Sequence, residues 1–75
     1  MTYKDKIEIN PLICSGKPVI KGTRILVSEI LTQLSAGESF ESLIKGFPGI
    51  TVEDLQTVLS FAAATVNNVE LEELV

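Results

Sequence analysis

Three cations in the first third of the chain have the side chains best suited to bind a charged partner. Lys17, Lys21 and Arg24 are four and three residues apart within the string GKPVIKGTRI, residues 16–25. Ammonium and guanidinium groups bind phosphate and carboxylate oxygens. We expect these three side chains to contact nucleic acid or a partner protein. For Arg24 the alternative is an ion pair with the chain's own carboxylates, or a contact with helix carbonyls.

Side chains that carry out catalysis are scarce. The chain has no histidine, the commonest general acid or base, so nothing activates its one cysteine, Cys14. Gly16-Lys17 is followed by Pro18, which excludes a phosphate-binding loop of the P-loop type. The acidic residues do not cluster like metal ligands, and one cysteine is too few for a structural zinc site. We expect a non-catalytic binding module without metal or cofactor, in which Cys14 is a small buried hydrophobe.

The charges are divided unevenly along the chain. Residues 1–25 carry five basic and two acidic residues, whereas residues 26–75 carry one basic and eight acidic residues. This division indicates either two contact surfaces of opposite sign or an ordinary solvated surface.

A short β-arm is predicted to position the three cations. Residues 7–9 alternate apolar and polar side chains, and residues 18–25 are rich in β-branched residues. Gly22 interrupts the second run and is predicted to mark a turn or bulge. We therefore expect a hairpin or extended arm over residues 7–26.

Three helices are predicted to follow the arm, with apolar residues at helical spacing from Val27 to Leu34 and from Phe40 to Phe47. Gly37 is expected to end the first helix, and Ser39 to cap the second. Thr51 is expected to cap the third, which would end at Asn67. The predicted core face of the third helix is Val52, Leu55, Leu59, Ala62 and Val66, widened by Val58 and Phe61. Its predicted outer positions are Glu53, Asp54, Gln56, Thr57, Ser60, Ala64 and Thr65.

The third helix is poorly suited to reading DNA, because its outer positions include no Lys or Arg and begin with two acids. Any DNA contact would have to use Lys17, Lys21 and Arg24, together with Lys4 and Lys6.

The predicted organisation is one domain over residues 1–75. It comprises the β-arm at 7–26, a mainly α, helix-turn-helix-like bundle at 27–66 and an acidic amphipathic tail at 67–75. Leu71, Leu74 and Val75 in this tail suit an apolar groove on a basic partner. The alternative is that the tail packs on the third helix or frays.

The composition predicts self-association and a soluble location. A chain of 75 residues with 45% hydrophobic residues has more apolar surface than so small an interior can hide, so we expect a homodimer. No signal peptide and no run of about 20 apolar residues is visible. The single thiol fits a reducing compartment. We expect a cytoplasmic protein that does not enter a membrane.

The string NPLICSGKPVIKGTRI, residues 10–25, resembles the signature of a bacterial and archaeal family, domain of unknown function 433. The resemblance extends over about residues 7–66, through a second helix that ends at Phe47-Pro48 and a third that begins at Thr51. Two positions depart from the pattern: Ser15 stands where the family often has glycine, and Leu26 where it often has proline.

This resemblance implies a homeodomain-like or winged-helix-like three-helix fold with a short N-terminal β-arm. It also implies the antitoxin of a type II toxin–antitoxin pair, which neutralises a PIN-like ribonuclease, with a DNA-binding autorepressor as the alternative. The acidic half of the chain could cover an RNA-gripping basic surface of the nuclease. Some such antitoxins insert an arginine into the acidic nuclease site, but the tail of this chain has no Arg or Lys.

Overall fold

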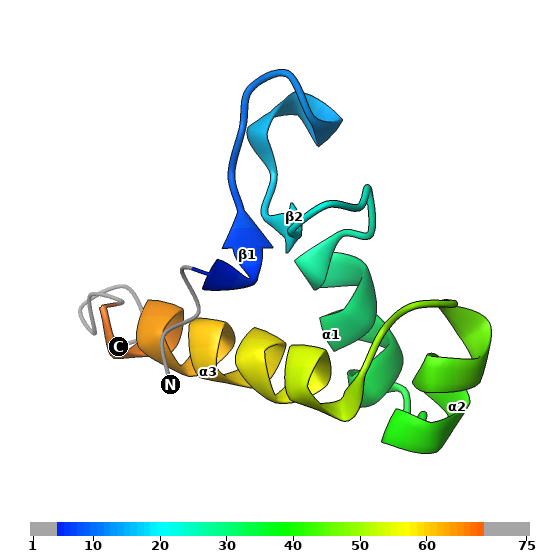
Figure 1. Cartoon of the computed structure of the whole chain (residues 1–75). Coiled ribbons are helices and arrows are strands. Elements are labelled where there is room, and N and C mark those ends of the chain that lie inside the picture. The colour runs from blue at the N-terminus through cyan, green and yellow to red at the C-terminus, as the bar shows by residue number, and fades with distance from the viewer. Residues whose placement is uncertain (1–4, 69–75) are drawn as a thin grey trace.

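The computed structural model describes residues 5–68, which form three helices and a two-stranded antiparallel sheet (Figure 1). The elements are β1 (Ile7–Glu8), β2 (Val19–Ile20), α1 (Val27–Ser35), α2 (Phe40–Gly46) and α3 (Val52–Asn67). A single 3-10 turn, Cys14–Gly16, lies between the strands. The prediction of a mainly helical chain with a short N-terminal β-arm is confirmed. The tail residues Leu71, Leu74 and Val75, and also Lys4, lie outside the described residues.

The small sheet ties the N-terminal segment to the start of α1. Ile7 pairs with Ile20 and Glu8 with Val19, and Val19 also forms an isolated bridge with Leu26. β2 therefore lies between β1 and the residue that precedes α1. Val19 and Ile20 are buried, which agrees with the structural role that their β-branched side chains predict.

Local signals set the helix ends where the sequence predicts them. α1 ends before Gly37, whose φ of +95° suits glycine. The Ser39 hydroxyl accepts a hydrogen bond from the Ser42 amide at 3.0 Å at the start of α2. Thr51 caps α3 through a reciprocal capping box with Asp54.

The core lies where the three helices meet beneath the sheet, and α1 contacts both α2 and α3. Its buried side chains come from both strands, all three helices and the loop before α3. They are Ile7, Ile20, Val27, Ile30, Leu43, Ile50, Leu55 and Val58.

The predicted core face of α3 is partly wrong. Val52, Leu59 and Val66 are 46%, 43% and 67% exposed, whereas Thr57, expected on the outer face, is fully buried. The helix is rotated so that Leu55 and Val58 face inward with Thr57. This rotation leaves Val52, Leu59 and Val66, which are seven residues apart, at the edge of the buried face. Thr57 tolerates burial because its hydroxyl donates a hydrogen bond to the Glu53 carbonyl at 2.9 Å.

Within residues 5–68, no helix combines the length and the apolar character that crossing a bilayer requires.

Candidate partner-binding arm

The loop of residues 9–18 between β1 and β2, called the arm from here on, projects away from the three helices (Figure 1). Its first turn is folded by Asn10, whose side-chain oxygen accepts a hydrogen bond from the Leu12 amide at 2.9 Å. The Asn10 carbonyl accepts another from the Ile13 amide at 2.8 Å. These local hydrogen bonds stabilise the turn at residues 10–13 from within the arm itself.

The second half of the arm has an unusual backbone. Cys14, Ser15 and Gly16 all have positive φ, at 49°, 59° and 83°. Left-handed backbone is costly for residues other than glycine, so surrounding contacts must hold it. One such contact comes from the half-buried Cys14, whose thiol lies 3.7 Å from the Arg24 carbonyl oxygen as a weak hydrogen-bond donor.

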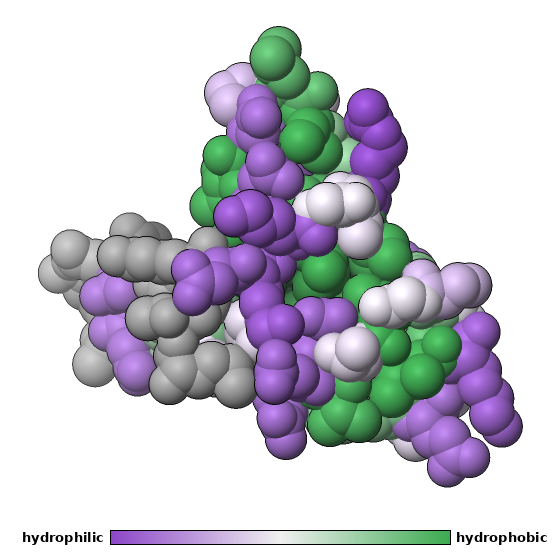
Figure 2. Space-filling view, viewed as in Figure 1, coloured by the Kyte–Doolittle hydropathy of each residue, from purple (hydrophilic) through white to green (hydrophobic). Residues whose placement is uncertain are grey.

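The arm exposes large apolar side chains. Leu12 is 88% exposed and Ile9 is 60% exposed. Figure 2 shows hydrophobic side chains at this projecting end, beside hydrophilic ones. Sequence reasoning missed both residues. The only available signal was the Asn10-Pro11 turn, which fixes the place of Leu12 in the loop but not its exposure.

The three predicted binding cations are all exposed. Within residues 5–68, the side chains of Lys17, Lys21 and Arg24 form no ion pair and no hydrogen bond. The internal ion pair considered for Arg24 is therefore not formed with any described carboxylate. As far as residues 5–68 are concerned, all three side chains are available for a partner's phosphates or carboxylates.

The cations do not all line one surface. Arg24 lines an open cleft of ≈ 580 Å³ at the base of the arm, together with Glu8, Ile13, Gly22 and Thr23. Lys21 lines a second hollow of ≈ 250 Å³. The other residues of this hollow are Asp5, Lys6, Ile20, Thr23, Gly49 and Asp54. Thr23 is common to both.

Thr23 also fixes the turn that separates Lys21 from Arg24. Its amide and its hydroxyl both donate to the Ile20 carbonyl, at 3.0 and 2.7 Å. Its hydroxyl in turn accepts from the Ile25 amide at 3.0 Å. Gly22 has a φ of +80° within this turn, as the sequence predicts for a turn glycine.

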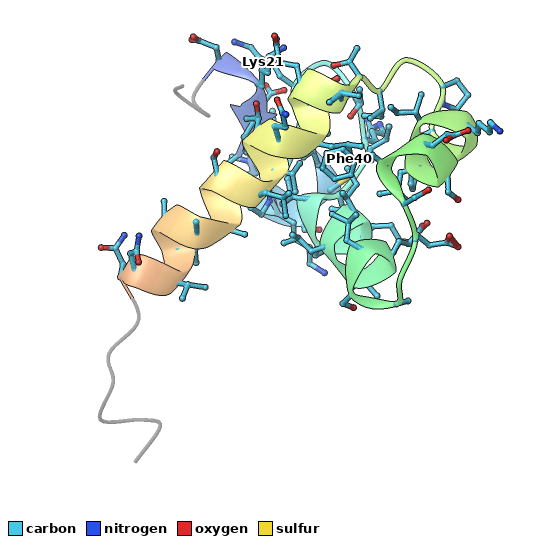
Figure 3. All side chains as sticks on the ribbon, turned by 90° about the horizontal axis from the view of Figure 1, so that it is seen from below. Lys21 and Phe40 are labelled. Atoms are coloured by element: carbon cyan, nitrogen blue, oxygen red, sulfur yellow. The ribbon has the colours of Figure 1, made fainter. Side chains whose placement is uncertain are left out.

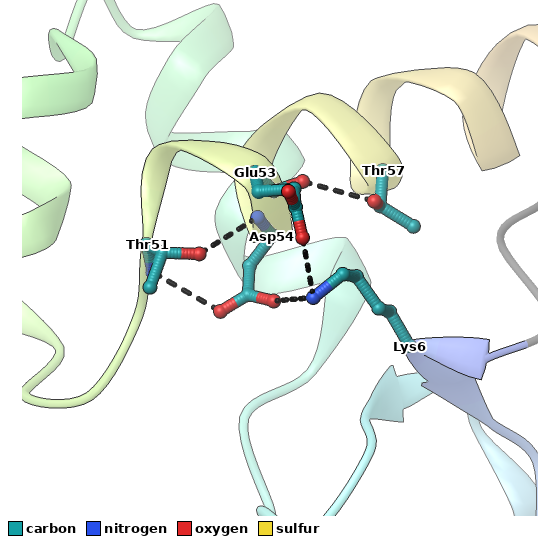
Figure 4. Close-up of polar contacts among 5 residues, drawn as sticks. All are labelled: Lys6, Thr51, Glu53, Asp54 and Thr57. Carbon is teal, nitrogen blue, oxygen red and sulfur yellow. Dashed lines mark hydrogen bonds and ion pairs between the residues drawn. The ribbon is translucent and has the colours of Figure 1, made fainter. Parts of the chain in front are cut away.

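Lys6, which the sequence offered for a DNA contact, pairs with two carboxylates of α3. Its Nζ lies 3.0 Å from Glu53 Oε1 and 3.4 Å from Asp54 Oδ1 (Figure 4). Asp54 Oδ2 accepts from the Thr51 amide at 3.0 Å, which joins the ion pair to the capping box. The hydrogen bond to Glu53 is the main cause that raises the pKa of Lys6 above its ordinary value of 10.5.

The described residues offer little else for chemistry. Residues 5–68 contain no group of three His, Cys, Asp or Glu side chains that could hold a metal ion. The arm can bind a partner through its exposed apolar side chains and Lys17, and the turn beside it adds the exposed Lys21 and Arg24.

Residues 7–62 match the family described as "Protein of unknown function (DUF433)". The chain belongs to the DUF433 family. The resemblance inferred from the GKPVIKGTRI string is thereby confirmed for the family.

Two relatives extend the DUF433 comparison. The chain is 28% identical over 61 residues to "Uncharacterized protein y4eO" of Sinorhizobium fredii, covering 81% of this chain and 28% of that protein. The crystal structure of a DUF433 member from Anabaena variabilis superposes with a TM-score of 0.79 at 28% identity. That match covers 85% of this chain and 63% of the other. This chain thus spans only part of the length of each relative.

The DUF433 pattern explains one feature of the arm. The resemblance to the family implies a glycine where this chain has Ser15, whose φ is +59°. Glycine adopts this backbone without steric cost, so the implied glycine suits the observed loop better than serine does.

Proposed function

We propose that this DUF433 chain is a non-catalytic antitoxin, which binds and neutralises a PIN-like ribonuclease through its arm. The observation that carries the proposal is Leu12, 88% exposed on a projecting loop that also carries the exposed Lys17. Its neighbour Ile13 lines the same cleft as Arg24, which pairs with no carboxylate among residues 5–68. Arginine is enriched among the residues that dominate interface energies, and an exposed leucine adds apolar surface that a partner can bury.

The chemistry of the arm suits a protein better than it suits a nucleic acid. Burying an exposed leucine side chain contributes about 1.5–3 kcal/mol, which a partner's apolar pocket would provide. The Arg24 guanidinium, free of described carboxylates, could pair with the acidic centre of the nuclease. The tail lacks an arginine for this purpose, and its Leu71, Leu74 and Val75 remain a proposed second contact.

A helix-turn-helix arrangement of α2 and α3, of the homeodomain-like or winged-helix-like type, is part of the proposal. It is supported by two capped helices joined by the short connection at residues 47–51, in which Ile50 is buried. In this arrangement the helices act as the scaffold, and the arm makes the contact.

The test is to search the reading frames beside that of this chain for a PIN-like nuclease, and to co-express the chain with it. The chain should co-purify with the nuclease and relieve its toxicity. Leu12→Ser and Arg24→Ala should each weaken the complex roughly tenfold or more, because the first removes the apolar contact of the arm and the second removes the charged contact of the adjoining cleft.

Lys45→Ala is the matched control. Lys45 is an exposed cation on α2 that pairs only with the exposed Glu41, at 3.7 Å. Its removal should leave the complex unchanged. Absence of co-purification, or full neutralisation by both Leu12→Ser and Arg24→Ala, would refute the proposal.

A second function, DNA binding as an autorepressor, is favoured by the exposure of Lys17, Lys21 and Arg24. Against it, α3 carries no Lys or Arg and begins with Glu53 and Asp54. If DNA is bound, affinity for the promoter should fall steeply with salt, and Lys21→Ala and Arg24→Ala should each weaken it. Leu12→Ser separates the two functions, because it should weaken nuclease binding and spare DNA binding.

A further inference from the structure

α3 presents a second, largely apolar surface that adjoins its buried face. The exposed residues Val52, Gln56, Leu59, Ala63 and Val66 are alternately four and three residues apart. This spacing places them along one line of the helix, as at the seam of a helix pair. These five residues are called the α3 stripe.

The described helices do not cover the stripe. The C-terminal half of α3 extends beyond α1 and α2 when the molecule is seen from the side and from below (Figures 1 and 3). Leu59 at the centre of the stripe is 43% exposed, and Val66 near its end is 67% exposed.

We propose that the α3 stripe binds a second copy of this chain, with the two α3 helices antiparallel about a two-fold axis at Leu59. Val52 and Val66 lie seven residues to either side of Leu59, about 10 Å along the helix. The axis therefore sets Leu59 against its equivalent and Val52 of each copy against Val66 of the other. Such a self-matching pattern is what a two-fold interface requires. Ala63, close to the axis, is small enough for the backbones to approach.

The charges on α3 favour a second copy of the chain as the partner, and an antiparallel arrangement of the two helices. Glu53 and Asp54 in the first turn are followed by no charged residue through Asn67. A charged partner would find no ion pair along the stripe, whereas a second copy brings no repulsion to it. A parallel pair would bring four carboxylates to one end with only the two Lys6 ammonium groups beside them. The antiparallel pair separates the carboxylates of the two copies by about 20 Å and sets each helix N-terminus beside the partner's C-terminus.

The size of the stripe sets the expected strength of association. α3 has 16 residues and is therefore about 24 Å long, and a contact along one helix is smaller than a standard protein interface. We expect dissociation in the range of about 10–500 µM, typical of a small interface.

Cysteine cross-linking tests the geometry in a Cys14→Ser background, which removes the only native thiol. Leu59→Cys should form a disulfide with its own equivalent upon mild oxidation. A mixture of the Val52→Cys and Val66→Cys chains should cross-link as a heterodimer, faster than either chain alone. Thr65→Cys, exposed on another side of α3, is the control and should remain uncross-linked. Disulfides form only between Cα atoms within about 7 Å, so these pairs report the register directly.

Two cross-linking results would overturn the proposal. Self-linking of Val52→Cys as fast as that of Leu59→Cys would mean parallel helices. Equal linking of Thr65→Cys would mean random collision.

Sedimentation tests the association itself at concentrations up to about 1 mM, above the expected dissociation range. Leu59→Glu should abolish the dimer and keep the far-UV circular dichroism of the wild type, because Leu59 is outside the core. Thr65→Glu introduces the same charge off the stripe and should leave the dimer intact. Wild-type chains that stay monomeric throughout would refute the proposal. A chain that is monomeric at full length and dimerises only after residues 69–75 are removed would also refute the proposal. That result would mean that residues 69–75 of the same chain bind the stripe.

Discussion

The backbones of Lys6 and Lys21 are joined by a hydrogen bond from the Lys21 amide to the Lys6 carbonyl at 2.8 Å, yet their side chains differ in role. Lys6 is held by the two carboxylates of the first turn of α3, whereas Lys21 is exposed and unpaired within the described residues. The location of α3, rather than residue type or strand, decides which lysine stabilises the fold and which is free to bind a partner.

The Lys6 ion pair predicts how stability depends on alkaline pH. The pKa of Lys6 is raised above 10.5 in the folded chain, chiefly by its hydrogen bond to Glu53. Its stabilising effect is therefore complete below the unfolded-state pKa, and is lost as the pH rises through the folded-state pKa. The difference in melting temperature between the wild type and Lys6→Met should be clear at about pH 8 and shrink above about pH 10.5.

Lys45→Met is the matched control for that measurement. Lys45 pairs with Glu41 on the surface of α2, where both side chains are about four-fifths exposed. Its replacement should have little effect at either pH. A Lys6→Met difference that stays constant or grows with pH would contradict the assignment.

Replacement of Gly22 is predicted to lower the stability of the fold through backbone strain alone. Gly22 has a φ of +80°, and a Cβ added there would meet nothing within 4 Å. Gly22→Ala should lower the free energy of unfolding by about 1 kcal/mol, and Gly22→Asn by less, as measured by urea denaturation. Gly46→Ala is the control. It has helical backbone and equal space, so it should be neutral or stabilising. A neutral Gly22→Ala would contradict the argument.

At the scale of elements, α3 connects the features described above. Its first turn is capped by Thr51, Asp54 and Lys6, its inner face carries Leu55 and Val58, and the α3 stripe adjoins that face. β1 reaches it through Lys6, so the strand and the helix end stabilise each other.

The capping box predicts a specific loss of helix stability. The Thr51 hydroxyl accepts from the Asp54 amide at 3.1 Å, and Thr51→Ala leaves that amide without this partner. Removal of such a cap costs about 1 kcal/mol, which lowers the melting temperature of a domain this small by about 4–8 °C. Thr32→Ala on exposed α1 is the control and should change it little. Equal effects of the two substitutions would show that the cap contributes nothing.

For the molecule as a whole, the arm and the α3 stripe are separate surfaces, since the arm projects on the side away from α3 (Figure 1). One lies in the basic third of the chain, and the other is an uncharged line on the helix that follows. This separation would let one chain hold a protein partner and a second copy of itself at the same time.

Independence of the two surfaces is the corresponding prediction. Leu12→Ser should weaken partner binding without changing sedimentation, and Leu59→Glu should do the reverse. In the double variant, the free energy of partner binding should equal that of Leu12→Ser, and the free energy of self-association should equal that of Leu59→Glu. Each should agree to within about 0.5 kcal/mol, as expected for distant sites. Nuclease affinity and self-association should be measured for the wild type, the two single variants and the double variant. Loss of both properties from either single substitution would mean that the surfaces are coupled.

The sequence by itself determined the helix ends, the turn at Gly22 and the membership of DUF433. Caps, glycines and apolar spacing act between residues within about four positions of one another, so they can be recognised without knowing the fold. The three cations were recognised for the same reason, because their type and spacing are local.

Only the tertiary structure decided which face of α3 is buried. Its apolar residues surround most of the helix, so periodicity left the rotation ambiguous, and packing against α1 and α2 selected Leu55, Val58 and Thr57. The pairing of Lys6 with Asp54 joins residues 48 positions apart, and the exposure of Leu12 depends on how the arm stands relative to the helices. Both are set by contacts, or by their absence, between distant segments of the chain, and local sequence patterns do not encode these.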